Sequence, residues 1–75
     1  MNAINVVCSN LHQIRKESKV SLDIIADLSE IHKSTLSKYE RGLMTPKLDT
    51  LEKWSNTLGY TLSLSLHKAL VEVEA

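Results

Sequence analysis

The feature that most constrains this chain is a change in the spacing of its apolar residues near residue 60. Before that point, apolar residues recur at intervals of three and four, the period of an α-helix that buries one face. From Thr61 to His67, polar and apolar residues alternate strictly, as in a half-buried β-strand. The sequence therefore predicts an all-α body over residues 1–60 and a strand with a tail over residues 61–75.

Four or five helices are expected in the body. Apolar spacing and end signals give ranges of about 4–18, 22–29, 33–40 and 48–58. Ser21 is a suitable N-cap for the second helix because its hydroxyl can accept hydrogen bonds from free backbone N–H groups. Gly42 and Gly59 end the third and fourth helices, since glycine adopts a left-handed conformation without strain. The expected core residues are Cys8, Leu11, Ile14, Leu36, Tyr39, Leu51 and Trp54.

The length and composition exclude several classes of protein. A chain of 75 residues makes one domain with a thin core, and its single cysteine can form no internal disulfide. The three histidines are scattered, and we expect His12 and His67 at the surface. No signal peptide, membrane-length apolar run, glycine-rich phosphate loop or nucleophile motif is evident. We therefore expect a cytoplasmic protein without a cofactor, a metal or enzymatic activity.

Charge is unevenly distributed along a chain whose formal net charge is zero. Residues 32–47 carry four cationic side chains and one anionic side chain, 4 − 1 = +3, whereas residues 48–75 carry two and four, 2 − 4 = −2. A local basic surface attracts a phosphate backbone even when the whole chain is neutral. An ordinary mixed surface remains an equally good interpretation of charge alone.

An ordered set of motifs runs from Ser21 to Gly59. A small residue, Ala26, is followed by a Ser/Thr-rich segment, Ser34 to Ser37, then by Tyr-Glu-Arg-Gly and by a Pro-x-Leu-x-Thr-Leu segment that begins at Pro46. With the preceding helix, this set resembles the lambda-repressor-like helix-turn-helix family of phage repressors and xenobiotic-response-element regulators. The resemblance covers roughly residues 5–60.

The chain departs from that family pattern at three neighbouring places. Glu30 occupies the turn position that is usually glycine, so either a non-glycine residue adopts the strained backbone of that turn or the turn differs locally. Ser29 replaces an aliphatic residue, and we expect Leu28 to compensate for it. Leu22 replaces a glutamine that often contacts DNA, which leaves only its backbone N–H for a phosphate.

The resemblance implies a transcriptional regulator that binds duplex operator DNA. Base edges in the major groove are read by short polar or basic side chains on an exposed helix. The resemblance also implies an ion pair between Arg15 and Glu40, which would tie the first helix to the end of the recognition helix. The implied base-contacting residues are Lys33, Ser34, Ser37 and Lys38, and the implied phosphate contacts are His32 and Arg41, with Ser21, Thr45 and Lys47 as weaker candidates.

The alternating segment lacks a partner strand elsewhere in the chain. An unpaired strand edge invites pairing with another chain, so we expect antiparallel pairing between two copies around a two-fold axis. Leu62, Leu64 and Leu66 would form the shared apolar face of that homodimer, and the operator would be palindromic. The alternative is a hairpin within one chain, with residues 70–73 folding back as a second strand.

The all-helical body followed by such a strand is similar to HipB-type antitoxins. That likeness implies autorepression of a toxin–antitoxin operon and a cognate toxin partner, a HipA-like kinase. A free-standing repressor is the nearest alternative interpretation. A protein-interaction module that has lost DNA binding is another, consistent with the neutral net charge and with Leu22.

Overall fold

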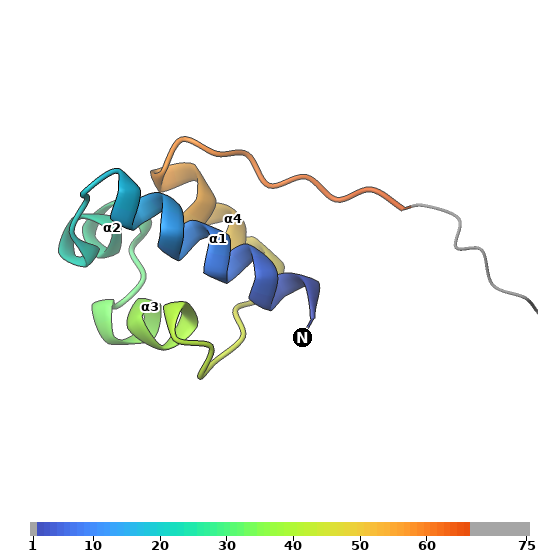
Figure 1. Cartoon of the computed structure of the whole chain (residues 1–75), viewed down its shortest axis with the longest axis horizontal. Helices are drawn as coiled ribbons and strands as arrows, with labels where there is room; N and C mark the ends of the chain where they lie inside the picture. The colour runs from blue at the N-terminus through green and yellow to red at the C-terminus, as the bar shows by residue number, and fades with distance from the viewer. Residues whose placement is uncertain (1, 67–75) are drawn as a thin grey trace, which may run out of the picture.

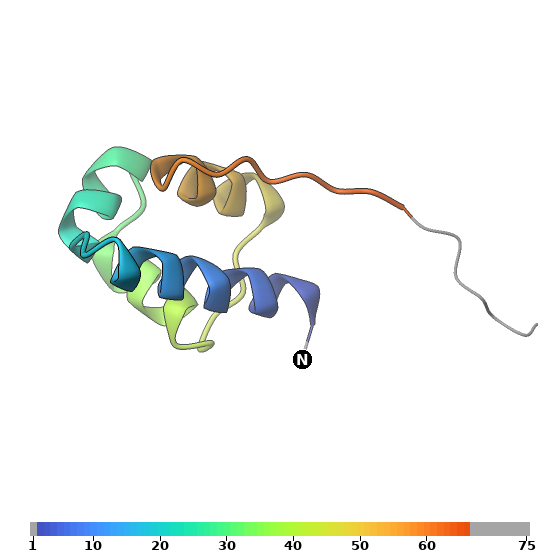
Figure 2. The same ribbon diagram turned by 45° about the horizontal axis from the view of Figure 1, so that its top comes forward.

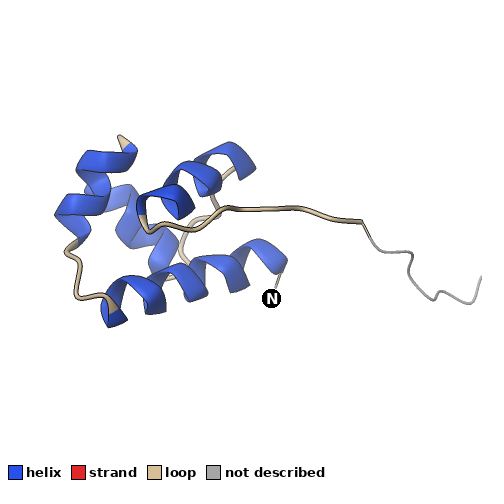
Figure 3. Ribbon diagram, turned by 90° about the horizontal axis from the view of Figure 1, so that it is seen from above, coloured by secondary structure: helices blue, strands red, loops and turns tan. Residues whose placement is uncertain are grey.

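The computed structural model of the chain describes residues 2–66, in which four α-helices and no strand occur (Figures 1 and 3). The helices are α1 (Ala3–Glu17), α2 (Leu22–Ser29), α3 (Lys33–Glu40) and α4 (Leu48–Thr57). Their bounds agree with the sequence-based ranges to within a residue. The prediction of an all-α body is therefore confirmed, with four helices in the described residues.

Polar side chains define where the first three helices begin. Asn2 accepts a hydrogen bond from the backbone N–H of Asn5 at 2.8 Å, and Ser21 accepts one from that of Ile24 at 3.3 Å. Each of these bonds satisfies a backbone donor that has no partner inside its own helix. The α3 helix starts with an unusual cap, the side chain of His32.

The turn between α2 and α3 has a strained backbone, which is one of the two possibilities that the sequence leaves open at Glu30. Glu30 follows α2 with φ 61° and ψ 22°, a left-handed conformation that costs a non-glycine residue energy. Ser29 is buried at 4% exposure, and its Oγ accepts a hydrogen bond from the Ile31 N–H at 3.2 Å. The expected compensation by Leu28 is wrong, because that residue is 63% exposed.

The core lies where the four helices meet. It consists of seven buried side chains, and Trp54, Ile25, Leu36 and Leu51 are the largest of those that are fully enclosed. The rings of Tyr39 and Trp54 stack with centroids 6.0 Å apart, which joins α3 to α4. The seven core residues are Cys8, Leu11, Ile25, Leu36, Tyr39, Leu51 and Trp54.

Helix α3 is held from two sides. It packs against both α1 and α2, while α2 also packs against α4. Figures 1 and 2 show α3 at one edge of the body, opposite the side where the chain leaves α4. One side of α3 is therefore in the core and the other faces solvent.

Residues 60–66 leave α4 and run in an extended course away from the helices (Figure 1). The expected strand over Thr61–His67 is not seen in the described residues, which end at Leu66. A strand is defined by pairing with a neighbour, and residues 2–66 contain no second strand. The alternative hairpin, residues 70–73, lies outside the described residues.

The three leucines of this segment are buried to different degrees. Leu62 contacts the hydrophobic core, whereas Leu64 and Leu66 are 72% and 103% exposed. The three leucines were predicted to share one apolar face of a dimer. In the single chain, Leu62 is partly buried against the core, and Leu64 and Leu66 are exposed. None of the helices in the described part of the chain is long and apolar enough to cross a lipid bilayer.

Candidate nucleic-acid interface

The buried residues of α3 determine which of its side chains face outward. Leu36 is fully buried and Tyr39 is 8% exposed, so both sit on the side that faces α1 and α2. The opposite side carries polar and cationic side chains at helical spacing, and we call these four residues the outer face of α3. They are Lys33, Ser34, Ser37 and Lys38, of which only Ser37 is half-buried.

His32 caps the N-terminus of α3. Its Nδ1 accepts a hydrogen bond from the Ser34 backbone N–H at 3.2 Å, and Ser34 Oγ lies 2.8 Å from the same nitrogen. A nitrogen that accepts cannot carry the ring proton, so in the neutral ring the proton is on Nε2. His32 is exposed, and Nε2 can therefore donate to a ligand while Nδ1 holds the helix.

The remaining predicted contacts lie around the outer face. Arg41 follows α3 directly and donates from Nε to the Ser37 carbonyl oxygen at 3.3 Å. Thr45 and Lys47 are exposed in the segment between α3 and α4. Ser21 is exposed as well, but its hydroxyl oxygen already caps α2.

Behind the outer face, Glu40 is the centre of a charged cluster. Its side chain is only 5% exposed, and Arg15 binds it with Nε 2.6 Å from Oε2 and Nη2 2.9 Å from Oε1. Arg15 Nη1 also donates to the Val20 carbonyl oxygen at 2.9 Å, which fixes the chain after α1. The cluster thus ties the C-terminal end of α3 to α1.

His12 belongs to the same cluster, so it is half-buried and bound to Glu40 rather than the plain surface residue that was expected. Its Nδ1 lies 2.8 Å from Glu40 Oε1, and its side chain is 36% exposed. Burial raises the pKa of Glu40, but hydrogen bonds from Arg15 and His12 outweigh burial, and the pKa of Glu40 lies below its ordinary value. The spacing of His12 and Arg15, three residues apart on one helix face, is the signal that could have revealed this contact.

A second ion pair that the sequence analysis missed lies at the other end of α3. Lys33 Nζ is 3.0 Å from Asp23 Oδ1, with the two side chains 55% and 72% exposed. Asp23 is in the first turn of α2 and Lys33 is the first residue of α3. Ten residues separate the pair in the chain, and only the turn between the helices brings them together.

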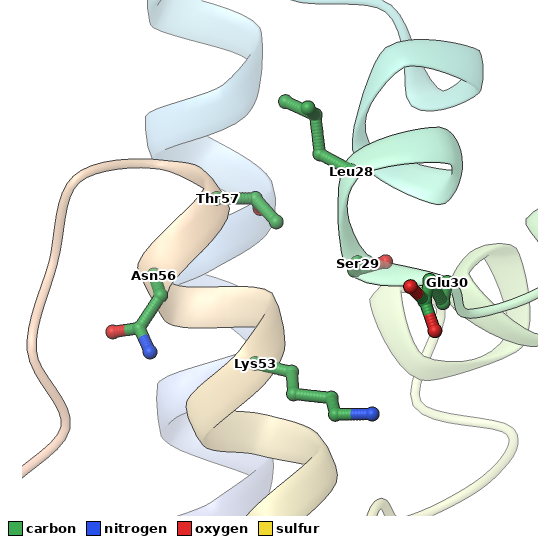
Figure 4. A pocket seen from close by; sticks show the side chains of 6 residues that line it. All are labelled: Leu28, Ser29, Glu30, Lys53, Asn56 and Thr57. Carbon is green, nitrogen blue, oxygen red and sulfur yellow. The ribbon is translucent and has the colours of Figure 1, made fainter.

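The cleft between α2 and α4, shown in Figure 4, is lined by none of the predicted DNA-contact residues. Leu28 and Lys53 stand on its two sides. Within residues 2–66, no three His, Cys, Asp or Glu side chains are grouped so as to hold a metal ion. Burial raises the pKa of the Cys8 thiol, partly offset by a backbone hydrogen bond, which disfavours its reactive thiolate form.

Comparison with known proteins agrees with this geometry. Residues 11–64 match the family described as helix-turn-helix. The chain is 36% identical over 56 residues to the HTH-type transcriptional regulator DdrOP3 of Deinococcus deserti, a match that covers 75% of this chain and 43% of that protein. The chain thus spans less than half the length of that relative. No solved structure matches it significantly. With α2 and α3 packed across a tight turn inside the matched region, the chain belongs to the helix-turn-helix family.

Proposed function

We propose that this protein is a sequence-specific regulator that binds duplex DNA and represses transcription by occluding its operator. The observation that carries the proposal is the outer face of α3, where two lysines and two serines stand on a helix whose other side is locked in the core. An α-helix of this kind fits the major groove, where base edges present distinct donors and acceptors. The name of the matched relative, a transcriptional regulator, supports the regulatory role.

The chemistry of the side chains separates residues that would contact bases from residues that would contact phosphates. Lys33 and Lys38 can donate to guanine O6 and N7, while Ser34 and Ser37 can bond to several base edges. His32 Nε2 and the Arg41 guanidinium suit phosphate oxygens, because phosphate contacts fix position without reading sequence. The protein would act in the cytoplasm, at the nucleoid, and would need no cofactor for this activity.

The tail, residues 61–75, would supply dimerisation. Leu48 is 44% exposed and shares a shallow hollow with Leu62 and Leu64, so apolar surface from α4 continues into the extended segment. A second copy that pairs its own segment there would cover Leu64 and Leu66. Two recognition helices would then meet a palindromic operator at half-sites about one helical turn apart.

Binding titrations with single substitutions test the DNA proposal. Lys33→Ala and Lys38→Ala should each weaken binding to the region upstream of the protein's own gene by about 1–3 kcal/mol where the lysine reads a base. Arg41→Ala should weaken binding to any duplex and reduce the salt dependence, since it contacts phosphate. Lys53→Ala is the matched control, because Lys53 lies on α4 beside the cleft of Figure 4. Unchanged binding in both lysine variants would contradict the assignment.

An antitoxin role is a second candidate, favoured by the exposed Leu64 and Leu66 of the extended segment. In this role the protein would repress its own operon and bind a toxin, a HipA-like kinase, encoded next to it. Co-expression with the neighbouring gene followed by purification tests it, and the expected result is a stable complex. A protein that binds DNA but copurifies with no neighbour would be a free-standing repressor. A protein that copurifies with a partner but binds no duplex would be an interaction module.

A further inference from the structure

The ion pair between Lys33 and Asp23 lies on the surface that we propose meets DNA. Lys33 Nζ is 3.0 Å from Asp23 Oδ1, and both side chains are more than half exposed. The bridge joins the first turn of α2 to the first residue of α3. The ammonium that would read a base is therefore already engaged by a carboxylate in the free protein.

The position of Lys33 is unfavourable for the stability of α3 itself. The N-terminus of a helix carries a partial positive charge, which attracts anions and repels cations. Asp23, in contrast, stands in the first turn of α2, where the same effect favours its negative charge. The dipole of α2 thus stabilises the negative charge of Asp23, and the dipole of α3 destabilises the positive charge of Lys33. The ion pair with Asp23 offsets the unfavourable position of Lys33.

The surroundings of the bridge are acidic. A shallow hollow beside it is lined by Asp23, Asp27 and Glu30 on the α2 side, and by His32 and Lys33 at the start of α3. Three acidic residues therefore line a hollow beside Lys33, at the edge of a surface that otherwise carries cationic side chains. Charges within about 10 Å influence one another at ordinary ionic strength, so a phosphate approaching Lys33 meets this field.

We propose that Asp23 restrains DNA binding by occupying Lys33 in the free protein. This inference rests on the proposed DNA-binding function. For Lys33 to donate to a base or a phosphate, its ammonium must leave Asp23. The free energy of the ion pair is then lost, and DNA binding is less favourable by that amount. Exposed ion pairs are weak, so the restraint amounts to a two- to fivefold reduction in affinity, roughly.

The test is a set of duplex-binding titrations on the full chain. Asp23→Asn keeps the size and hydrogen-bonding capacity of the side chain but removes its charge. The probes are the duplex upstream of the protein's own gene and a random-sequence duplex of equal length. Asp23→Asn should raise affinity for the upstream duplex by about two- to fivefold, with a larger gain at low salt.

Two further variants separate competition for Lys33 from simple repulsion of DNA. Asp27→Asn removes a charge that lines the same hollow but forms no ion pair with another of the residues 2–66. It should raise affinity less than Asp23→Asn does. In a Lys33→Ala background, Asp23→Asn should have no more effect than Asp27→Asn, because there is no ammonium left to release.

Three outcomes would overturn the inference while leaving the proposed function intact. They are an equal gain from Asp23→Asn with and without Lys33, no gain at all, or a loss of affinity that would make Asp23 a residue that positions Lys33 for DNA. If the unaltered protein binds neither duplex, the proposed function itself fails, and this inference fails with it.

Discussion

Arg15 holds Glu40 through two of its nitrogen atoms, with Nε 2.6 Å from Oε2 and Nη2 2.9 Å from Oε1. The carboxylate is nearly enclosed at 5% exposure, and the guanidinium side chain is 16% exposed. Breaking one side of such a pair leaves the other charge in a poorly solvated place. The orientation of α3 relative to α1 therefore depends on both residues together.

A double-mutant cycle on this pair is the first prediction. Arg15→Ala and Glu40→Ala should each lower the free energy of unfolding by about 3 kcal/mol, and the double variant should lose much less than the sum. Urea unfolding followed by the fluorescence of Trp54, the single tryptophan, measures each value. Arg15→Lys is the informative control, because a lysine cannot form the two-nitrogen contact. Additivity within about 0.5 kcal/mol would show that the two side chains do not interact energetically.

Acid should destabilise the protein through Glu40. Its pKa in the folded protein is lowered, although burial alone would raise it, because Arg15 and His12 hydrogen-bond to the ionised form. A lowered folded pKa means that the unfolded state binds the proton more readily. The stabilisation is therefore complete above about pH 4.3, the ordinary value for glutamate, and is lost as the pH falls through the folded pKa.

The Glu40→Gln variant tests this pH dependence. It should be less stable than the parent at pH 7, and its stability should decline less between about pH 5 and pH 3, where ordinary carboxyl groups take up protons. Asp49→Asn, an exposed position in the first turn of α4, is the control for general acid effects. If the stability of the parent and that of Glu40→Gln fell equally as the pH is lowered, the proposed role of Glu40 would be contradicted.

His12 should contribute measurably to stability despite its partial exposure. His12→Ala removes the 2.8 Å contact to Glu40 and should lower the free energy of unfolding by about 0.5–1.5 kcal/mol. Gln13→Ala, an exposed neighbour on α1, should change it by less than about 0.5 kcal/mol. Equal effects of the two substitutions would place His12 outside the Glu40 cluster.

The turn after α2 should be improved by glycine. Glu30→Gly removes the cost of a left-handed backbone at φ 61° and should raise stability by up to about 1 kcal/mol, after allowing for the extra freedom of glycine in the unfolded chain. Glu30→Ala keeps the Cβ atom and should bring no such gain. Thermal unfolding monitored by circular dichroism compares the three proteins. A destabilised Glu30→Gly variant would show that the side chain matters more than the backbone.

The proposed dimer is tested at Leu64. This side chain is 72% exposed, so Leu64→Glu should leave the helical body intact. It should nevertheless yield a monomer in analytical ultracentrifugation and a steep loss of operator affinity, since two linked half-sites bind far more tightly than two separate ones. Ser63→Glu is the matched control on the neighbouring exposed residue. A Leu64→Glu protein that stays a tight dimer would assign the interface to the helices instead.

The sequence was most informative where local rules and the tertiary fold agree. The bounds of α3 follow from its apolar spacing and from Gly42, and the structure gives Lys33–Glu40. The left-handed turn at Glu30 was one of two possibilities, because the family pattern usually has glycine, which adopts that backbone freely, at this position. These features depend on short-range periodicity and backbone sterics, which are readable from neighbouring residues.

The features that were missed depend on contacts between distant residues. The Asp23–Lys33 ion pair forms only at a particular angle between α2 and α3, which the sequence does not give. The exposure of Leu28 depends on how α2 is rotated about its axis where it packs against α4. The alternating segment encodes a tendency to pair but not the identity of its partner. Periodicity alone therefore predicted a strand that a single chain, over residues 2–66, does not form.

The two sides of α3 have different freedom to change during evolution. Leu36, Tyr39 and Glu40 are tied to the core and to α1, so most replacements there would cost this small domain a large part of its stability. Replacements at exposed positions such as Lys33, Ser34 and Lys38 typically change stability by only about 0.5 kcal/mol. Mutations on the outer face can thus accumulate without unfolding the protein, and descendants of this chain could acquire new ligand preferences on an unchanged scaffold.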